Sequence, residues 1–139
     1  MMGINDIGWP DSVLAPADKM PTADQVIAGH QQIIARAHLH HLRIIGATLT
    51  PFEDTFHGTP LFGYYSEDKE KVRQAVNTWI RESGAYDAVA DFDAVVRDPA
   101  NPKHIKAEFD SGDQLHPNDA GYVAMADSID LGALLGNTR

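Results

Sequence analysis

The sequence contains no cysteine among its 139 residues. Disulfide frameworks, thiolate nucleophiles and cysteine zinc sites are therefore excluded. Positive charge is also scarce, because 11 lysine and arginine residues stand against 20 aspartate and glutamate residues and give a formal net charge of −9. Such a surface repels phosphate backbones and anionic membranes. We therefore expect neither nucleic acid nor a membrane as a partner.

Long apolar runs are absent too, and none approaches the roughly 20 residues that span a bilayer. The N-terminal residues lack the basic and apolar regions of a signal peptide. As it stands, the chain is predicted to be cytoplasmic, a prediction that an absent N-terminal part could change. At 139 residues and 43% hydrophobic, the chain fits a single domain over 1–139.

Three segments with helical periodicity predict helices. Residues 24–41 form the first, and Ser66 can cap the second, with Gly84 just past its end. The predicted inward face of the second helix comprises Val72, Ala75, Val76, Trp79 and Ile80. Asn118 or Asp119 can cap the last helix. Its predicted inward face comprises Tyr122, Val123, Ala126 and Ile129.

Two short apolar runs, at 42–50 and 87–96, predict strands between these helices. Strands that alternate with helices favour parallel pairing in an α/β layered domain. Two parallel strands cannot cover three helices, and the apolar first strand would leave a bare edge that invites pairing with another chain. Either strands are missing or a partner supplies them, and we expect a homo-oligomer that covers this edge.

The stretch DSGDQLHPND, residues 110–119, contains the candidate base. Asp113 and His116 lie three residues apart in a turn, where a carboxylate can orient an imidazole and stabilise its charged form. An isolated pair of this spacing is also typical of an aspartate that caps a turn beside a surface histidine.

The stretch GINDIG, residues 3–8, contains a candidate oxyanion donor. Asn5 in a loop flanked by glycines can direct its side-chain amide at a developing negative charge. The same pattern is common in ordinary turns. This stretch and the Asp113 and His116 pair lie at opposite ends of one short α/β chain. The two together are a more specific signal than either one alone.

Together these stretches resemble the SGNH hydrolases, also called GDSL-type esterases and lipases. Residues 3–6 look like the family's third conserved block, residues 113–118 look like its fifth, and the resemblance covers nearly the whole chain. It implies a three-layer α/β/α, flavodoxin-like fold with a parallel sheet. It also implies that His116 is the base, Asp113 its orienting partner, Asn5 the oxyanion donor and Gly3 the residue that shapes the donor's loop.

The family's first block, which carries the nucleophilic serine, and its second block have no counterpart here, so the chain resembles a family member truncated at the N-terminal side. The sequence has five serines. Three of them are better explained by helix positions, namely Ser66, Ser83 and Ser128. Ser12 and Ser111 are the possible substitute nucleophiles, and a water molecule activated by His116 is the third possibility.

The resulting hypothesis is a carboxylic ester hydrolase that acts on short-chain or aryl esters without the usual serine. We expect no cofactor. We also expect no metal, because His38 and His41 have no third ligand nearby and fit a solvated helix end. The alternative is a catalytically inactive structural remnant of an SGNH hydrolase that forms oligomers.

Overall fold

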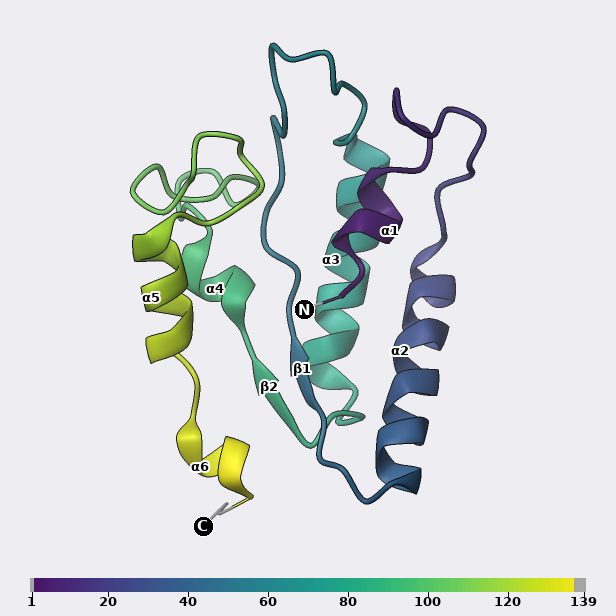
Figure 1. Cartoon of the computed structure of the whole chain (residues 1–139), viewed down its shortest axis with the longest axis vertical. Coiled ribbons are helices and arrows are strands. Elements are labelled where there is room, and N and C mark those ends of the chain that lie inside the picture. Colours follow the sequence, from purple (N-terminus) through teal and green to yellow (C-terminus); the bar gives the residue numbers. More distant parts are fainter. Residues whose placement is uncertain (1, 137–139) are drawn as a thin grey trace.

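The computed structural model describes residues 2–136. Two long helices, α2 (Ala23–Leu39) and α3 (Glu67–Glu82), pack against each other, and the short helix α1 (Ile4–Gly8) packs on α3. These three helices lie on one side of the strands in Figure 1, and the later helices lie on the other. In the described range, no helix combines the length and the apolar character needed to cross a membrane.

Within residues 2–136 the sheet consists of two parallel strands, β1 (Ile45–Ala47) and β2 (Ala88–Ala90), joined by a crossover that contains α3. Ile45 lies opposite Ala88, and the register continues to the end of both strands. The predicted α/β fold with a parallel sheet is confirmed, although both strands are shorter than the apolar runs that predicted them.

Only Ala88–Ala90 of the second apolar run forms a strand, which corrects the prediction for 87–96. After Asp91 the chain forms the short helix α4 (Phe92–Val96). The Asp91 carboxylate accepts a hydrogen bond from the backbone N–H of Ala94 and so caps this helix. Strand β2 therefore ends before Asp91, because this residue caps the helix that follows.

The two long predicted helices are confirmed, although α2 ends at Leu39 and not at residue 41. Thr22 and Gln25 form a capping box at the start of α2. The Ser66 hydroxyl accepts from the Lys69 backbone N–H at the start of α3, and Ser83 is the C-cap residue.

The last predicted helix corresponds to α5 (Asp119–Asp127), with Asn118 as its cap, and is followed by α6 (Leu131–Leu135). Its predicted inward face is wrong at three of its four residues, and the fourth, Ile129, lies just after the helix and is partly buried. Gly121 and Met125 are buried. Three residues predicted to be buried are exposed, namely Tyr122, Val123 and Ala126.

The reason for this orientation of α5 is close packing at Gly121. A Cβ atom there would lie 2.9 Å from the Phe109 carbonyl oxygen and 2.8 Å from the Pro117 side chain. Only glycine lets the helix approach the loop this closely, and Met125, one turn later, enters the core on the same face.

The core has two parts. The larger part joins α1, α2 and α3 to the chain that follows β1, and its buried members are Ile7, Val26, Leu49, Phe52, Tyr64, Val72, Val76, Ile80 and Leu115. The smaller part joins α4 to α5, and its buried members are Val96, Ile105 and Met125.

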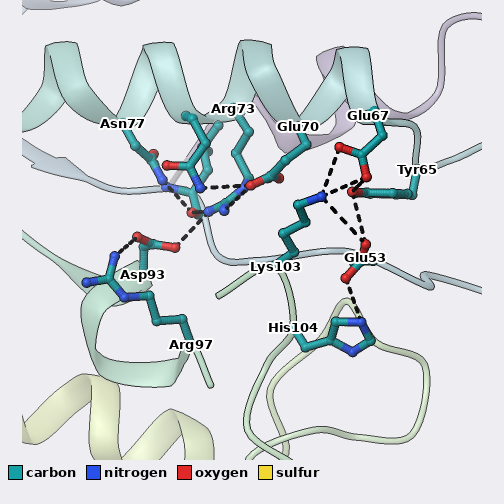
Figure 2. A network of polar contacts seen from close by, with 12 residues as sticks. Glu53, Tyr65, Glu67, Glu70, Arg73, Asn77, Asp93, Arg97, Lys103 and His104 are labelled. Atoms are coloured by element: carbon teal, nitrogen blue, oxygen red, sulfur yellow. Dashed lines mark hydrogen bonds and ion pairs between the residues drawn. The ribbon is translucent and has the colours of Figure 1, made fainter. Parts of the chain in front are cut away.

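Helix α3 also buries charged side chains that the sequence did not reveal. Arg73 is fully buried, and its guanidinium donates to both carboxylate oxygens of Glu70, to Asp93 Oδ1 and to the Leu49 carbonyl, all at 2.7 Å (Figure 2). Burial opposes the charge on Arg73, but its bonds to Glu70 and Asp93 raise its pKa. The network ties α3 to the segment that follows β1 and to α4. Ala75, predicted to face inward, is exposed.

The outer edge of β1 has no strand partner within residues 2–136. Beyond the end of β1, the Asn77 side chain makes the hydrogen bonds that a neighbouring strand would make. Its amide accepts from the Leu49 N–H at 2.7 Å and donates to the Leu49 carbonyl at 2.8 Å. Beside β1 lies an apolar hollow of about 210 Å³, whose lining residues are Met2, His30, Ile33, Ile44, Ile45, Ala47 and Tyr86.

Candidate active site

The candidate residues lie on segments at one end of the sheet. In Figure 1 both strands point toward the end of the molecule that holds α1 and the loops 48–65 and 98–118. This is the end at which the strands finish. In open α/β sheets, ligands bind beyond the carboxyl ends of the strands.

Asp113 and His116 form the predicted pair. His116 Nδ1 lies 2.6 Å from Asp113 Oδ2. Because an ionised carboxylate can only accept, Nδ1 carries the proton of this bond, and Nε2 is left as the acceptor of a neutral ring. The His116 side chain is 60% exposed, so this nitrogen is within reach of a solvent-borne substrate.

The second oxygen of Asp113 is held by its own loop. Oδ1 accepts from the backbone N–H groups of Leu115 and His116 at 2.9 and 2.8 Å, and from the Ser111 hydroxyl at 3.0 Å. Partial burial alone would raise the pKa of this carboxyl, but these bonds and the His116 ring lower it to about 2. Asp113 is therefore ionised wherever a histidine can act as a base.

The loop that carries the pair is anchored on both sides. Leu115 is buried in the larger core. The Asp113 carbonyl accepts from the Phe56 N–H at 3.2 Å, and the Gln114 carbonyl accepts from the Thr55 hydroxyl at 3.0 Å. These contacts join the loop to the segment that follows β1.

Asn5 lies in helix α1 and not in the loop predicted for residues 3–8. Gly3 begins this helix with a φ of +118°, a conformation that L side chains rarely adopt, and its carbonyl accepts from the Ile7 N–H. The helix forms because Ile7 is fully buried and holds this turn on the core. The Asn5 side chain is exposed, and its Oδ1 accepts from the Tyr64 hydroxyl at 2.7 Å.

Asn5 and His116 are connected through two aromatic residues. The Tyr64 ring packs against the Phe56 ring with centroids 5.5 Å apart. Phe56 in turn donates its backbone N–H to Asp113. The two predicted stretches, from opposite ends of the chain, are thus held by the single segment 52–65.

The two substitute serines are placed differently. Ser111 donates to Asp113 and so supports the carboxylate. The Ser12 hydroxyl is buried and has no hydrogen-bond partner among the residues described. The backbone around it packs against Gly63, where a Cβ would lie 3.2 Å from the Ser12 Cα. Neither hydroxyl forms a hydrogen bond with His116 in the described chain.

A pocket of about 340 Å³ adjoins Asp113, and its lining includes neither His116 nor Asn5. Its lining is partly polar and consists of Asp54, Phe56, His57, Thr59, His104, Gly112, Asp113 and Gln114. Across residues 2–136, no group of three or more histidine or acidic side chains is placed to hold a metal ion. A separate hollow of about 230 Å³, lined in part by Met2 and Ile33, lies beside α2 and includes neither Asp113 nor His116.

The GDSL-like Lipase/Acylhydrolase family matches residues 1–124, and the chain belongs to this family. Among solved structures, it is similar to a GDSL-like lipase from Bacteroides thetaiotaomicron, with 16% identity over 96% of this chain and a TM-score of 0.71. It is also similar to a proposed acylhydrolase from Bacteroides fragilis, with 15% identity over 98% of this chain and a TM-score of 0.68. No curated protein matches the chain.

At these identities the two solved structures show the fold alone. The chain spans 60% of the length of each of them. This agrees with the predicted truncation of the fold, and family membership supports a hydrolase at a coarse level.

Three residues that support the site were not found from the sequence. Tyr64 and Lys69 hold α1, and Phe56 holds the Asp113 loop. None of them has a local signal, because each acts on a segment more than 50 residues away.

Proposed function

We propose that the chain carries the acid–base half of an ester hydrolase, with His116 as general base, Asp113 as its orienting partner and Asn5 as the oxyanion donor. The observation that carries the proposal is the 2.6 Å contact between His116 Nδ1 and Asp113 Oδ2. This contact leaves Nε2 exposed and able to accept a proton.

Water is the nucleophile that the contacts favour, since the Ser111 hydroxyl is bonded to Asp113 and the Ser12 hydroxyl is buried. His116 Nε2 takes a proton from water as the oxygen attacks the ester carbonyl. The amide of Asn5 donates to the oxygen that becomes negative. His116 then returns the proton to the leaving alcohol, so that one ester and one water give one acid and one alcohol.

The pocket beside Asp113 supports a small substrate. Its volume of about 340 Å³ is at the low end of ligand pockets, and its partly polar lining suits short-chain or aryl esters better than long acyl chains.

The test is the hydrolysis of p-nitrophenyl acetate by the wild type and by the His116→Ala, Asn5→Ala, Ser12→Ala and Ser111→Ala variants. We expect His116→Ala to fall to the uncatalysed rate and Asn5→Ala to lose on the order of 10²-fold in kcat. If water is the nucleophile, Ser12→Ala retains wild-type activity. A Ser12→Ala variant without activity would make this serine the nucleophile instead.

A second candidate function, a non-catalytic component that pairs through its sheet, is favoured by the open edge of β1. It predicts that no variant differs from the uncatalysed rate. The wild-type measurement separates the two candidates.

A further inference from the structure

We propose that Tyr64 and Lys69 are positioning residues for the Asn5 amide: Tyr64 fixes its rotation, and Lys69 holds together the two segments that carry Asn5 and Tyr64. This inference rests on the proposed role of Asn5.

Tyr64 determines which end of the amide faces outward. Its hydroxyl donates to Asn5 Oδ1 at 2.7 Å from a fully buried ring. An amide carries its acceptor and its donors on opposite sides, so a bond that holds Oδ1 toward the core directs the Nδ2 donors toward solvent. Burial raises the pKa of Tyr64, and the nearby Asp6 adds to the effect, so this hydroxyl keeps the proton that it donates.

The Tyr64 ring has a fixed place against α1. A Cβ atom at Gly8 would lie 2.3 Å from the Tyr64 ring, so the ring lies where only glycine leaves room. Trp9 packs on it edge-to-face with centroids 4.7 Å apart, and Phe52 packs on it at 6.1 Å. A ring confined on these sides cannot carry its hydroxyl away from Asn5 without disturbing the core.

Lys69 connects the two segments. Its side chain is buried, with the residue only 2% exposed, and Nζ donates to the Gly8 carbonyl at 2.7 Å and to the Gly63 carbonyl at 2.6 Å. Gly8 ends the helix that carries Asn5, and Gly63 immediately precedes Tyr64. A buried ammonium group is stable only when its N–H groups donate hydrogen bonds. Lys69 therefore holds the two carbonyls at a fixed separation, and with them the segments that carry Asn5 and Tyr64.

The matched controls come from neighbouring residues. Tyr65 donates to Glu67 and Glu53 and not to Asn5, and Lys71 pairs with Asp68 on the exposed face of α3. Tyr65→Phe and Lys71→Met therefore remove the same groups as Tyr64→Phe and Lys69→Met without touching the Asn5 amide.

The experiment records the side-chain NH₂ signals of Asn5 in ¹⁵N-labelled protein, assigned by their absence in Asn5→Ala. We expect Tyr64→Phe and Lys69→Met to shift these signals and to speed their exchange with solvent, whereas both controls leave them unchanged. In the ester assay, Tyr64→Phe should lower kcat about fivefold to tenfold at unchanged KM, the loss of one neutral hydrogen bond.

Unchanged Asn5 signals in Tyr64→Phe would overturn the proposal, and this variant decides the matter even where Lys69→Met fails to fold. If the wild type hydrolyses no ester but the Asn5 signals shift as expected, the positioning stands and the proposed function fails. If the wild type is active and Tyr64→Phe matches it in both signals and kcat, the positioning is refuted while the function stands.

Discussion

Asp113→Asn removes the charge that holds His116 and leaves a side chain of nearly the same shape. In the folded chain this carboxylate accepts hydrogen bonds on both oxygens, two of them from backbone N–H groups of its own loop. The variant should therefore lose stability at neutral pH and, unlike the wild type, should lose little more on acidification.

The magnitude follows from the pKa. A fall from the ordinary value of 3.8 to about 2 corresponds to about 2 kcal/mol of unfolding free energy. The side chain is 31% exposed and its partner ring is more exposed still, so screening by solvent reduces the expected effect to roughly 1–2 kcal/mol. Because the folded pKa is depressed, this stability is fully present above about pH 4 and is lost as the pH falls toward 2.

The assay is urea unfolding of the wild type and of Asp113→Asn at several values between pH 7 and pH 2.5. Asp127→Asn is the control, since Asp127 is an exposed residue of α5. We expect the wild type and Asp113→Asn to differ at pH 7 and to converge at the acid end. If the unfolding free energies of the two proteins differ by the same amount at every pH between 7 and 2.5, the view that the loop is built around an ionised Asp113 is refuted.

Two further predictions concern the core network and the sheet edge. Arg73→Met leaves Glu70 and Asp93 buried without their shared partner and should lower the free energy of unfolding in urea by about 3 kcal/mol. The control Lys71→Met, at an exposed position, should change this free energy little. A loss in Arg73→Met no larger than that of the control would show that the network is not needed for stability. We also propose that two copies pair through the open edge of β1. Sedimentation velocity at micromolar concentration should then show a dimer or a larger species, and Ile45→Lys should convert it to monomer. A monomeric wild type would contradict this proposal.

The parts of the fold that the sequence predicted are those set by local signals. The long helices were predicted because apolar periodicity and, for α3, the cap residue Ser66 act within a few residues of one another. The first strand was predicted by its β-rich apolar run. The Asp113 and His116 pair was also local, because three residues of one turn bring the two side chains together.

The parts that the sequence did not predict depend on distant packing. Arg73 lies outside the inward face that was predicted for its helix. Its burial depends on Glu70 in the same helix and on two distant partners, the Asp93 carboxylate 20 positions later and the Leu49 carbonyl 24 positions earlier. The face that α5 turns inward depends on the close approach of Gly121 to Phe109. The orientation of Asn5 depends on Tyr64, which lies 59 positions away.

The central claim is that His116 is the base of an ester hydrolase. The measurement that tests it most directly is the pH–rate profile of p-nitrophenyl acetate hydrolysis for the wild type beside His116→Ala. We predict that the wild-type rate rises with pH, because only the deprotonated imidazole of His116 can accept a proton, while the variant follows the buffer alone. Two profiles that coincide at every pH would contradict the claim.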